Sequence, residues 1–141
     1  MPSAMGWRAR LNGPTLRDSV RAGIELVLAR LRLDTPATRD KIAASSRSKP
    51  AVRLDSHQTA VVSRVAYIIP RVGARLPWRA DCLIQALAAE RWLGRQGIAT
   101  TLHLGIRKDQ ATPFEAHAWL TAGDQVVTGG DTANYQPVSR R

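Results

Sequence analysis

The chain has 141 residues, 44 % of them hydrophobic and 23 % charged, which suits one ordinary domain with a buried core. It carries a single cysteine, and this excludes both an internal disulfide and a zinc site built from several cysteines. Its formal net charge is +10, from 21 basic and 11 acidic residues, so anionic partners are favoured.

The positive charge is spread along the chain, and only two tyrosines and one phenylalanine are available to stack on bases. Nucleic acid is therefore a weak candidate as a partner. No apolar run reaches the roughly 20 residues of a membrane-spanning helix. The basic amino terminus is not followed by an apolar signal segment, so we expect a cytoplasmic protein.

The amino-terminal half of the chain is predicted to be helical. Over residues 16–33 large aliphatic side chains recur at steps of three and four, with arginines between them, which is typical of an amphipathic helix. We expect this apolar stripe to pack on the protein's own core; contact with a membrane or an acidic partner is the alternative. The stripe consists of Leu16, Val20, Ile24, Val27 and Leu31.

Two further helices are expected before the middle of the chain. In the polar segment that follows the first helix, Thr35 and Pro36 are suited to cap and start a short helix, and residues 45–50 resemble a loop. Another helix is predicted to begin near Asp55 and to end around Pro70, since a proline interrupts helical hydrogen bonding.

The next predicted helix carries the only cysteine. Pro77 disfavours helix just before it, and Asp81 is a suitable N-cap for a helix that opens at Cys82. The helical period continues to Gln96, and Gly97 supplies the left-handed residue at which the helix stops. Unpaired N–H groups at a helix amino terminus stabilise a thiolate, and the N–H of Cys82 can face an oxyanion. The alternative is that Cys82 is a small buried hydrophobe.

From residue 98 the pattern changes to that of strands. Apolar and polar or small residues alternate over 98–106, a second strand is predicted over 115–122, and Gly123 and Asp124 make a turn into a third strand at 125–128. The last ten residues are expected to be an irregular tail. Helices followed by an antiparallel meander predict an α+β domain.

His117 is the candidate base, because a thiol nucleophile needs a group that takes its proton. It lies on the second strand between two alanines, which leave room for the ring to reach another element. A histidine satisfied by a backbone carbonyl is the alternative. His103 is the competing base and a candidate substrate contact, on the face opposite Leu102 and Leu104, although a solvated position is the simpler interpretation. His57 is expected to be exposed at a helix start.

A catalytic histidine is normally oriented by a carboxylate on its far nitrogen. A two-residue turn after the second strand places His117 opposite Gly130, and a three-residue turn places it opposite Asp131. We therefore expect Asp131 to be the third member of the site. Asp124 at the turn is too distant, and Asp81 is better explained as a helix cap.

Four blocks of the sequence, in order, resemble the leader peptidases of lasso-peptide biosynthesis. These are transglutaminase-like proteins that form the protease half of the B protein. The resemblance covers residues 76–131, preceded by a basic helical part over 1–75 and followed by a tail over 132–141 of the same domain. The blocks are Cys82–Ala88, Leu93–Ile98, Leu102–Lys108 and Ala116–Leu120.

The resemblance implies a papain-like fold and a Cys-His-Asp triad, with Cys82 as nucleophile, His117 as base and Asp131 as acid. Trp78 or Arg79 would lie near a second donor to the oxyanion, unless Trp78 serves in packing. The substrate would be the leader segment of a ribosomally made precursor peptide. A separate leader-recognition protein would assist, and a lasso cyclase would take the freed core peptide.

Two other functions fit the same residues. The triad could pass the acyl group to an amine, as transglutaminases do, instead of to water. A non-enzymatic basic binding domain, in which Cys82 is merely buried, is the second alternative. No metal or organic cofactor is implied, since one cysteine and three scattered histidines make no ligand set.

Overall fold

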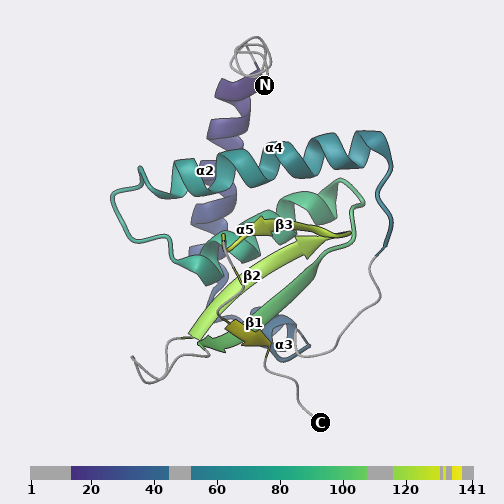
Figure 1. Ribbon diagram of the computed structural model, residues 1–141. Helices are drawn as coiled ribbons and strands as arrows, with labels where there is room; N and C mark the ends of the chain where they lie inside the picture. The colour runs from purple at the N-terminus through teal and green to yellow at the C-terminus, as the bar shows by residue number, and fades with distance from the viewer. Residues whose placement is uncertain (1–13, 45–51, 108–115, 131, 133–134, 138–141) are drawn as a thin grey trace.

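The computed structural model describes residues 14–44, 52–107, 116–130, 132 and 135–137. Four helices precede a small antiparallel sheet, which gives the α+β architecture expected from the sequence (Figure 1). The elements are α2 (Pro14–Arg32), α3 (Pro36–Ala44), α4 (Ser56–Gly73), α5 (Cys82–Arg95), β1 (Thr101–Arg107), β2 (Ala116–Ala122), β3 (Gln125–Thr128) and β4 (Tyr135–Pro137).

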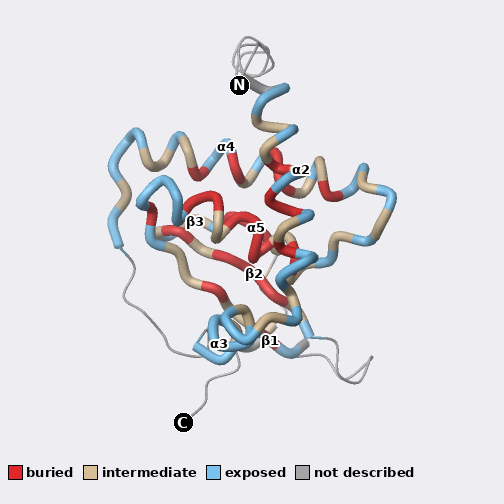
Figure 2. The backbone as a smooth tube through the Cα atoms, turned by 180° about the vertical axis from the view of Figure 1, so that it is seen from behind, coloured by how far each residue is buried: buried red, intermediate tan, exposed pale blue. Residues whose placement is uncertain are grey.

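The sheet has the strand order β3-β2-β1-β4, and all of its pairs are antiparallel. Helix α5 contacts β1, β2 and β3, while α2 and α4 contact α5 and each other. The helix that begins at Cys82 is therefore sandwiched between the sheet and the other two long helices. Figure 2 shows the buried residues gathered where α5 meets β2, α2 and α4.

Helix α4 begins where its capping residues predict. The N–H of Gln58 donates to Asp55 Oδ1 at 2.7 Å, and the N–H of Asp55 donates to Gln58 Oε1 at 3.1 Å, which forms a capping box. The sequence predicted that the helix would end around Pro70, but it continues for three more residues, to Gly73. A proline removes a single donor, and here it lies in the last turn, where the buried Ile69 and Gly73 hold the chain against the core.

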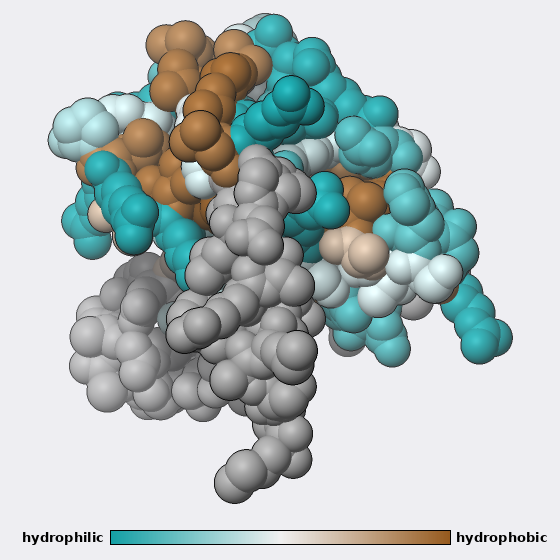
Figure 3. All heavy atoms as spheres, turned by 90° about the horizontal axis from the view of Figure 1, so that it is seen from above, coloured by the Kyte–Doolittle hydropathy of each residue, from teal (hydrophilic) through white to brown (hydrophobic). Residues whose placement is uncertain are grey.

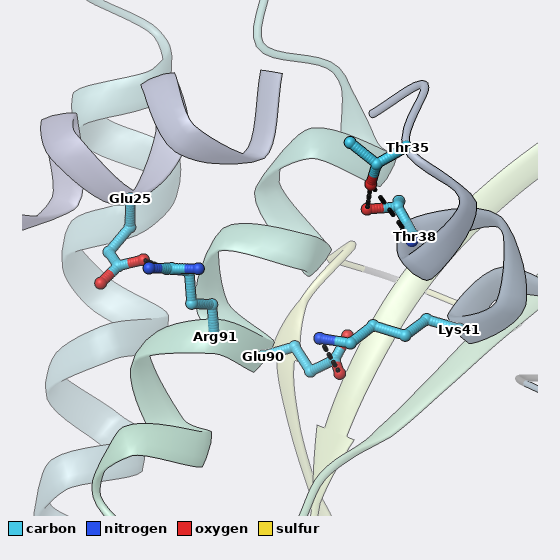
Figure 4. Close-up of polar contacts among 6 residues, drawn as sticks. All are labelled: Glu25, Thr35, Thr38, Lys41, Glu90 and Arg91. Atoms are coloured by element: carbon cyan, nitrogen blue, oxygen red, sulfur yellow. Dashed lines mark hydrogen bonds and ion pairs between the residues drawn. The ribbon is translucent and has the colours of Figure 1, made fainter. Parts of the chain in front are cut away.

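Helix α3 also begins as predicted. The N–H of Thr38 donates to Thr35 Oγ1 at 3.4 Å, so Thr35 acts as the cap and Pro36 is the first helical residue. None of the residues of α3 is buried, and the helix is tied to α5 by Lys41, whose Nζ lies 3.3 Å from Glu90 Oε1 (Figure 4). The loop predicted over 45–50 lies outside the described residues.

The expectation of an irregular tail over the last ten residues was wrong for residues 135–137. Residues Tyr135–Pro137 form β4, which pairs with β1 through Arg107↔Tyr135 and Gly105↔Pro137. The outer side of β1 presents unpaired backbone groups that a short segment can satisfy, and a proline is tolerated there because β4 is an edge strand.

The expected packing of α2 was also wrong. All five aliphatic residues of the predicted stripe are exposed, from 40 % for Val27 to 75 % for Leu16. The residues of α2 that enter the core include two alanines, because helices that approach closely need small side chains at the contact. They are Ala22, Glu25, Leu26 and Ala29.

One acidic side chain of α2 is enclosed in the interior. Glu25 is 2 % exposed, and its Oε2 lies 3.0 Å from Arg91 Nε on α5 (Figure 4). The two atoms are at ion-pair distance without forming a hydrogen bond. Loss of either partner would leave a buried charge uncompensated, so this pair helps to fix α2 on α5.

None of the described helices combines the length and the apolar character that crossing a membrane requires.

Candidate active site

Cys82 is the first residue of α5, as the sequence predicts. Asp81 is the N-cap: its backbone is extended, and its Oδ1 accepts from the N–H of Ile84 at 3.0 Å. The carbonyl of Asp81 accepts from the N–H of Gln85 at 3.0 Å, which is the first bond of the helix. The half-buried thiol therefore stands at the amino terminus of the helix that packs on the sheet.

We expect Asp81→Ala to lower the free energy of unfolding by about 1 kcal/mol, because the N–H of Ile84 loses its acceptor. Asp81→Ser is the matched control, since a serine hydroxyl caps a helix nearly as well. Urea unfolding of both variants measures the effect. Equal losses in the two variants would show that the cap itself contributes nothing.

The thiol lies against β2, next to the predicted base. The N–H of Ala118 donates to Cys82 Sγ at 3.5 Å, and Ala118 directly follows His117 in the strand. β3 ends at Thr128, opposite Leu120, so among the described strands this part of β2 is paired with β1 alone. The sulfur occupies the edge that β3 leaves open, and Cys82 and His117 thus come to one place in the fold.

His117 is held by a backbone carbonyl. Its Nε2 donates to the Gly129 carbonyl oxygen at 2.7 Å. When Nε2 of a neutral imidazole carries the proton, Nδ1 keeps the lone pair and can accept a proton. The hydrogen bond therefore sets the tautomer that a general base needs.

Both predicted registers of the β2–β3 hairpin occur in the structure. Ala122 pairs with Gln125 across the two-residue turn, but an irregularity between Leu120 and Thr121 shifts the pairing by one residue, so that Leu120 pairs with Thr128. From Leu120 the pairing therefore follows the register that a three-residue turn predicts. Asp131 itself lies outside the described residues, and its role as the acid stays a prediction.

His117 belongs to a row of stacked aromatic rings. Its ring centroid lies 4.6 Å from that of Tyr135 and 6.1 Å from that of Trp119, and His103 stacks on Trp119 at 5.3 Å. Sequence reasoning missed Trp119, although it is two residues after His117 and so on the same strand face. It also missed Tyr135, because the tail was not expected to join the sheet.

His103 does lie opposite the core face of β1, where Leu102 is buried. Its Nε2 is 2.9 Å from Thr121 Oγ1, and Trp119 covers its ring. Desolvation by burial lowers the pKa of His103 below the usual 6.5. The ring is thus kept neutral at physiological pH and is separated from His117 by the indole of Trp119.

The lowered pKa of His103 makes stability depend on pH. Because the unfolded chain takes up this proton more readily than the folded protein, His103 supports stability above about pH 6.5, and the support is lost as pH falls through the folded pKa. When the pH is lowered from about 7.5 to about 5.5, we expect the free energy of unfolding, measured with urea, to fall less in His103→Gln than in wild type. His57→Gln, at an exposed histidine, is the control and should follow wild type. Identical curves for all three proteins would contradict the prediction.

The remaining predicted residues lie apart from this constellation. Trp78 is half-buried and packs against the core, and Arg79 is exposed; no described contact joins either of them to Cys82 or His117. Their predicted part in holding an oxyanion stays a prediction. His57 is exposed in the first turn of α4, as expected. Within the described part of the chain, no three His, Cys, Asp or Glu residues are grouped so as to hold a metal ion.

The family model for the transglutaminase-like superfamily matches residues 24–140. The match spans the second half of α2, the other three helices and the whole sheet, and it includes Cys82, His117 and Asp131. No curated protein and no solved structure matches the chain.

Proposed function

Because the chain belongs to the transglutaminase-like superfamily, we propose that it is a cysteine peptidase in which Cys82 is the nucleophile and His117 the base. One observation carries the proposal: the Ala118 N–H donates to Cys82 Sγ at 3.5 Å, so the thiol at the start of α5 lies against the residue that follows His117. A thiol at a helix amino terminus beside an oriented imidazole is the arrangement of a cysteine nucleophile.

The substrate in this proposal is the leader segment of a lasso-peptide precursor. The resemblance of residues 76–131 to the leader peptidases supports this assignment, and the net charge of +10 suits an acidic leader or partner. A separate recognition protein presents the leader, and a cyclase takes the core peptide. A cytoplasmic location belongs to the same proposal.

The reaction begins when Nδ1 of His117 takes the proton of the Cys82 thiol. The sulfur then forms a bond to the carbonyl carbon of the last leader residue, and the N–H of Cys82 stabilises the oxyanion. The C–N bond breaks as the imidazolium returns its proton to the leaving amine of the core peptide. Water then attacks the thioester while His117 takes a proton from it, and release of the leader acid restores the thiol.

The test is cleavage of a precursor peptide, followed by mass spectrometry, with and without the recognition protein. The matched control is the same protein alkylated with iodoacetamide, which reaches Cys82 alone because the chain has no other cysteine. We expect a single cut at the leader–core junction, and none after alkylation.

Two outcomes favour the alternatives. A leader that carries an added amine at its new end, in place of a free acid, would identify an acyl transferase. The absence of cleavage with the partner present, together with a thiol no more reactive than free cysteine, would favour a binding domain.

A further inference from the structure

The five exposed aliphatic residues of α2 form a continuous surface, here called the α2 stripe. More than half of the large exposed apolar side chains in the described chain belong to it, and Ile24 at its middle is 54 % exposed. Figure 3, viewed from the end at which α2 begins, shows hydrophobic side chains gathered mainly on one side of the molecule. Apolar patches of this kind on a small protein mark a contact with another molecule.

The geometry of the stripe suits one helix. At 3.6 residues per turn and 1.5 Å per residue, it covers an arc of about 80° and a length of about 22 Å. Val20 and Val27 are seven residues apart, as are Ile24 and Leu31, which is the spacing of a coiled-coil seam. A helix that lies in a membrane surface normally presents a wider apolar face than this.

The charges around the stripe define the partner further. Arg17 and Arg30 are exposed on α2 and lie on opposite sides of the stripe. The acidic side chains of the helix are engaged within the chain: Asp18 Oδ2 lies 3.6 Å from Arg64 Nε, and Glu25 is paired with Arg91. The border of the stripe is therefore positive. A second copy of the chain would bring the same charge to the contact, which disfavours self-association.

We propose that the α2 stripe docks an amphipathic helix of a partner protein, with acidic residues on both sides of that helix's apolar seam. The opposite face of α2 packs on α4 and α5, so the docked helix lies away from the sheet that carries His117. The α2 stripe takes no part in the chemistry at Cys82. The outcome of a binding experiment on the stripe therefore does not bear on the peptidase proposal.

The probe is a labelled synthetic helix of about three heptads, with a Leu/Ile/Val seam flanked by glutamates, and a second peptide in which lysines replace the glutamates. Binding to the full chain is followed by fluorescence anisotropy. We expect the acidic peptide to bind at least about tenfold more tightly than the basic one. Ile24→Ser/Val27→Ser should weaken it at least about tenfold, whereas Val52→Ser/Val126→Ser, at exposed apolar residues elsewhere, should not.

A charge-reversed variant gives a second readout. Arg17→Glu/Arg30→Glu keeps the apolar seam, and it should weaken the acidic peptide and strengthen the basic one. Equal binding of the two peptides, or an equal loss in the Val52→Ser/Val126→Ser control, overturns the proposal. Binding to phosphatidylserine vesicles that depends on the stripe, in place of binding to the acidic peptide, assigns the surface to a membrane. A dimer in sedimentation that Ile24→Ser/Val27→Ser abolishes assigns it to a second copy.

Discussion

Cys82→Ala is expected to lower kcat for precursor cleavage by about 10⁴-fold or more, to the limit of detection. The sulfur is the atom that forms the bond to the acyl carbon in the proposed reaction, and the single cysteine leaves no other thiol to replace it. Quantitative mass spectrometry of the released leader measures the loss. His57→Ala, at an exposed histidine far along the chain from the site, should cleave as wild type does.

The pair Cys82 and His117 should behave as one unit. His117→Ala alone is expected to lower kcat by about 10³-fold or more, because the thiol loses its base. The double variant should be no slower than Cys82→Ala, since a base without a nucleophile does nothing. Circular dichroism confirms that each variant is folded. Losses that multiply in the double variant would mean that the two residues act independently, and cleavage by Cys82→Ala would place the nucleophile elsewhere.

The part of the site that the sequence predicted well is governed by local interactions. Asp81 caps the helix at Cys82 through bonds within three residues, and Gly97, with φ of 72°, ends the helical segment by its own backbone freedom. Such signals depend on neighbours in the chain and not on the rest of the fold. The same holds for the turn at Gly123, whose φ is 58°.

The predictions that were wrong concern features that depend on contacts between distant parts of the chain. Periodicity shows that α2 has an apolar face over Leu16 to Leu31, but it does not show which face is inside. The opposite face packs on α4 and α5 through small residues and through Glu25, whose carboxylate is paired with Arg91. The local sequence does not predict that this glutamate is buried, because its partner lies on another helix.

The register of the β2–β3 hairpin and the structure of the tail also depend on contacts beyond the local sequence. The sequence left two registers open, and the structure uses one on each side of the shift at Leu120, in a strand that also contacts α5. β4 is three residues long and owes its existence to the free edge of β1. Tyr135 therefore reaches His117 through a pairing that no pattern within the tail indicates.

Gly129→Ala is expected to lower the free energy of unfolding by about 4 kcal/mol, the sum of about 2 kcal/mol each from backbone strain and steric overlap. The φ of Gly129 is 103°, a conformation that side chains avoid, and an added Cβ would lie 2.3 Å from Trp119 Cβ and 3.0 Å from Trp119 Cα. Trp119 is only 6 % exposed and its backbone belongs to β2, so neither atom can move away freely.

The neighbouring glycine provides the matched control. Gly130 also has a positive φ, 63°, but an added Cβ there meets nothing within 4 Å. Gly130→Ala should therefore lose only the backbone term, about 1 to 2 kcal/mol. Urea unfolding of the two variants separates the cost of overlap with Trp119 from the cost of backbone strain. Equal midpoints would show that Trp119 can shift at no measurable cost in stability.

The same substitution tests whether the Gly129 carbonyl positions the base. Its oxygen accepts from His117 Nε2 at 2.7 Å, and a residue that is forced away from Trp119 takes this acceptor with it. At a temperature where circular dichroism shows both variants folded, we expect Gly129→Ala to lose kcat with little change in KM, and Gly130→Ala to keep it. If Gly129→Ala retains the wild-type kcat and pH–rate profile, the carbonyl does not orient His117.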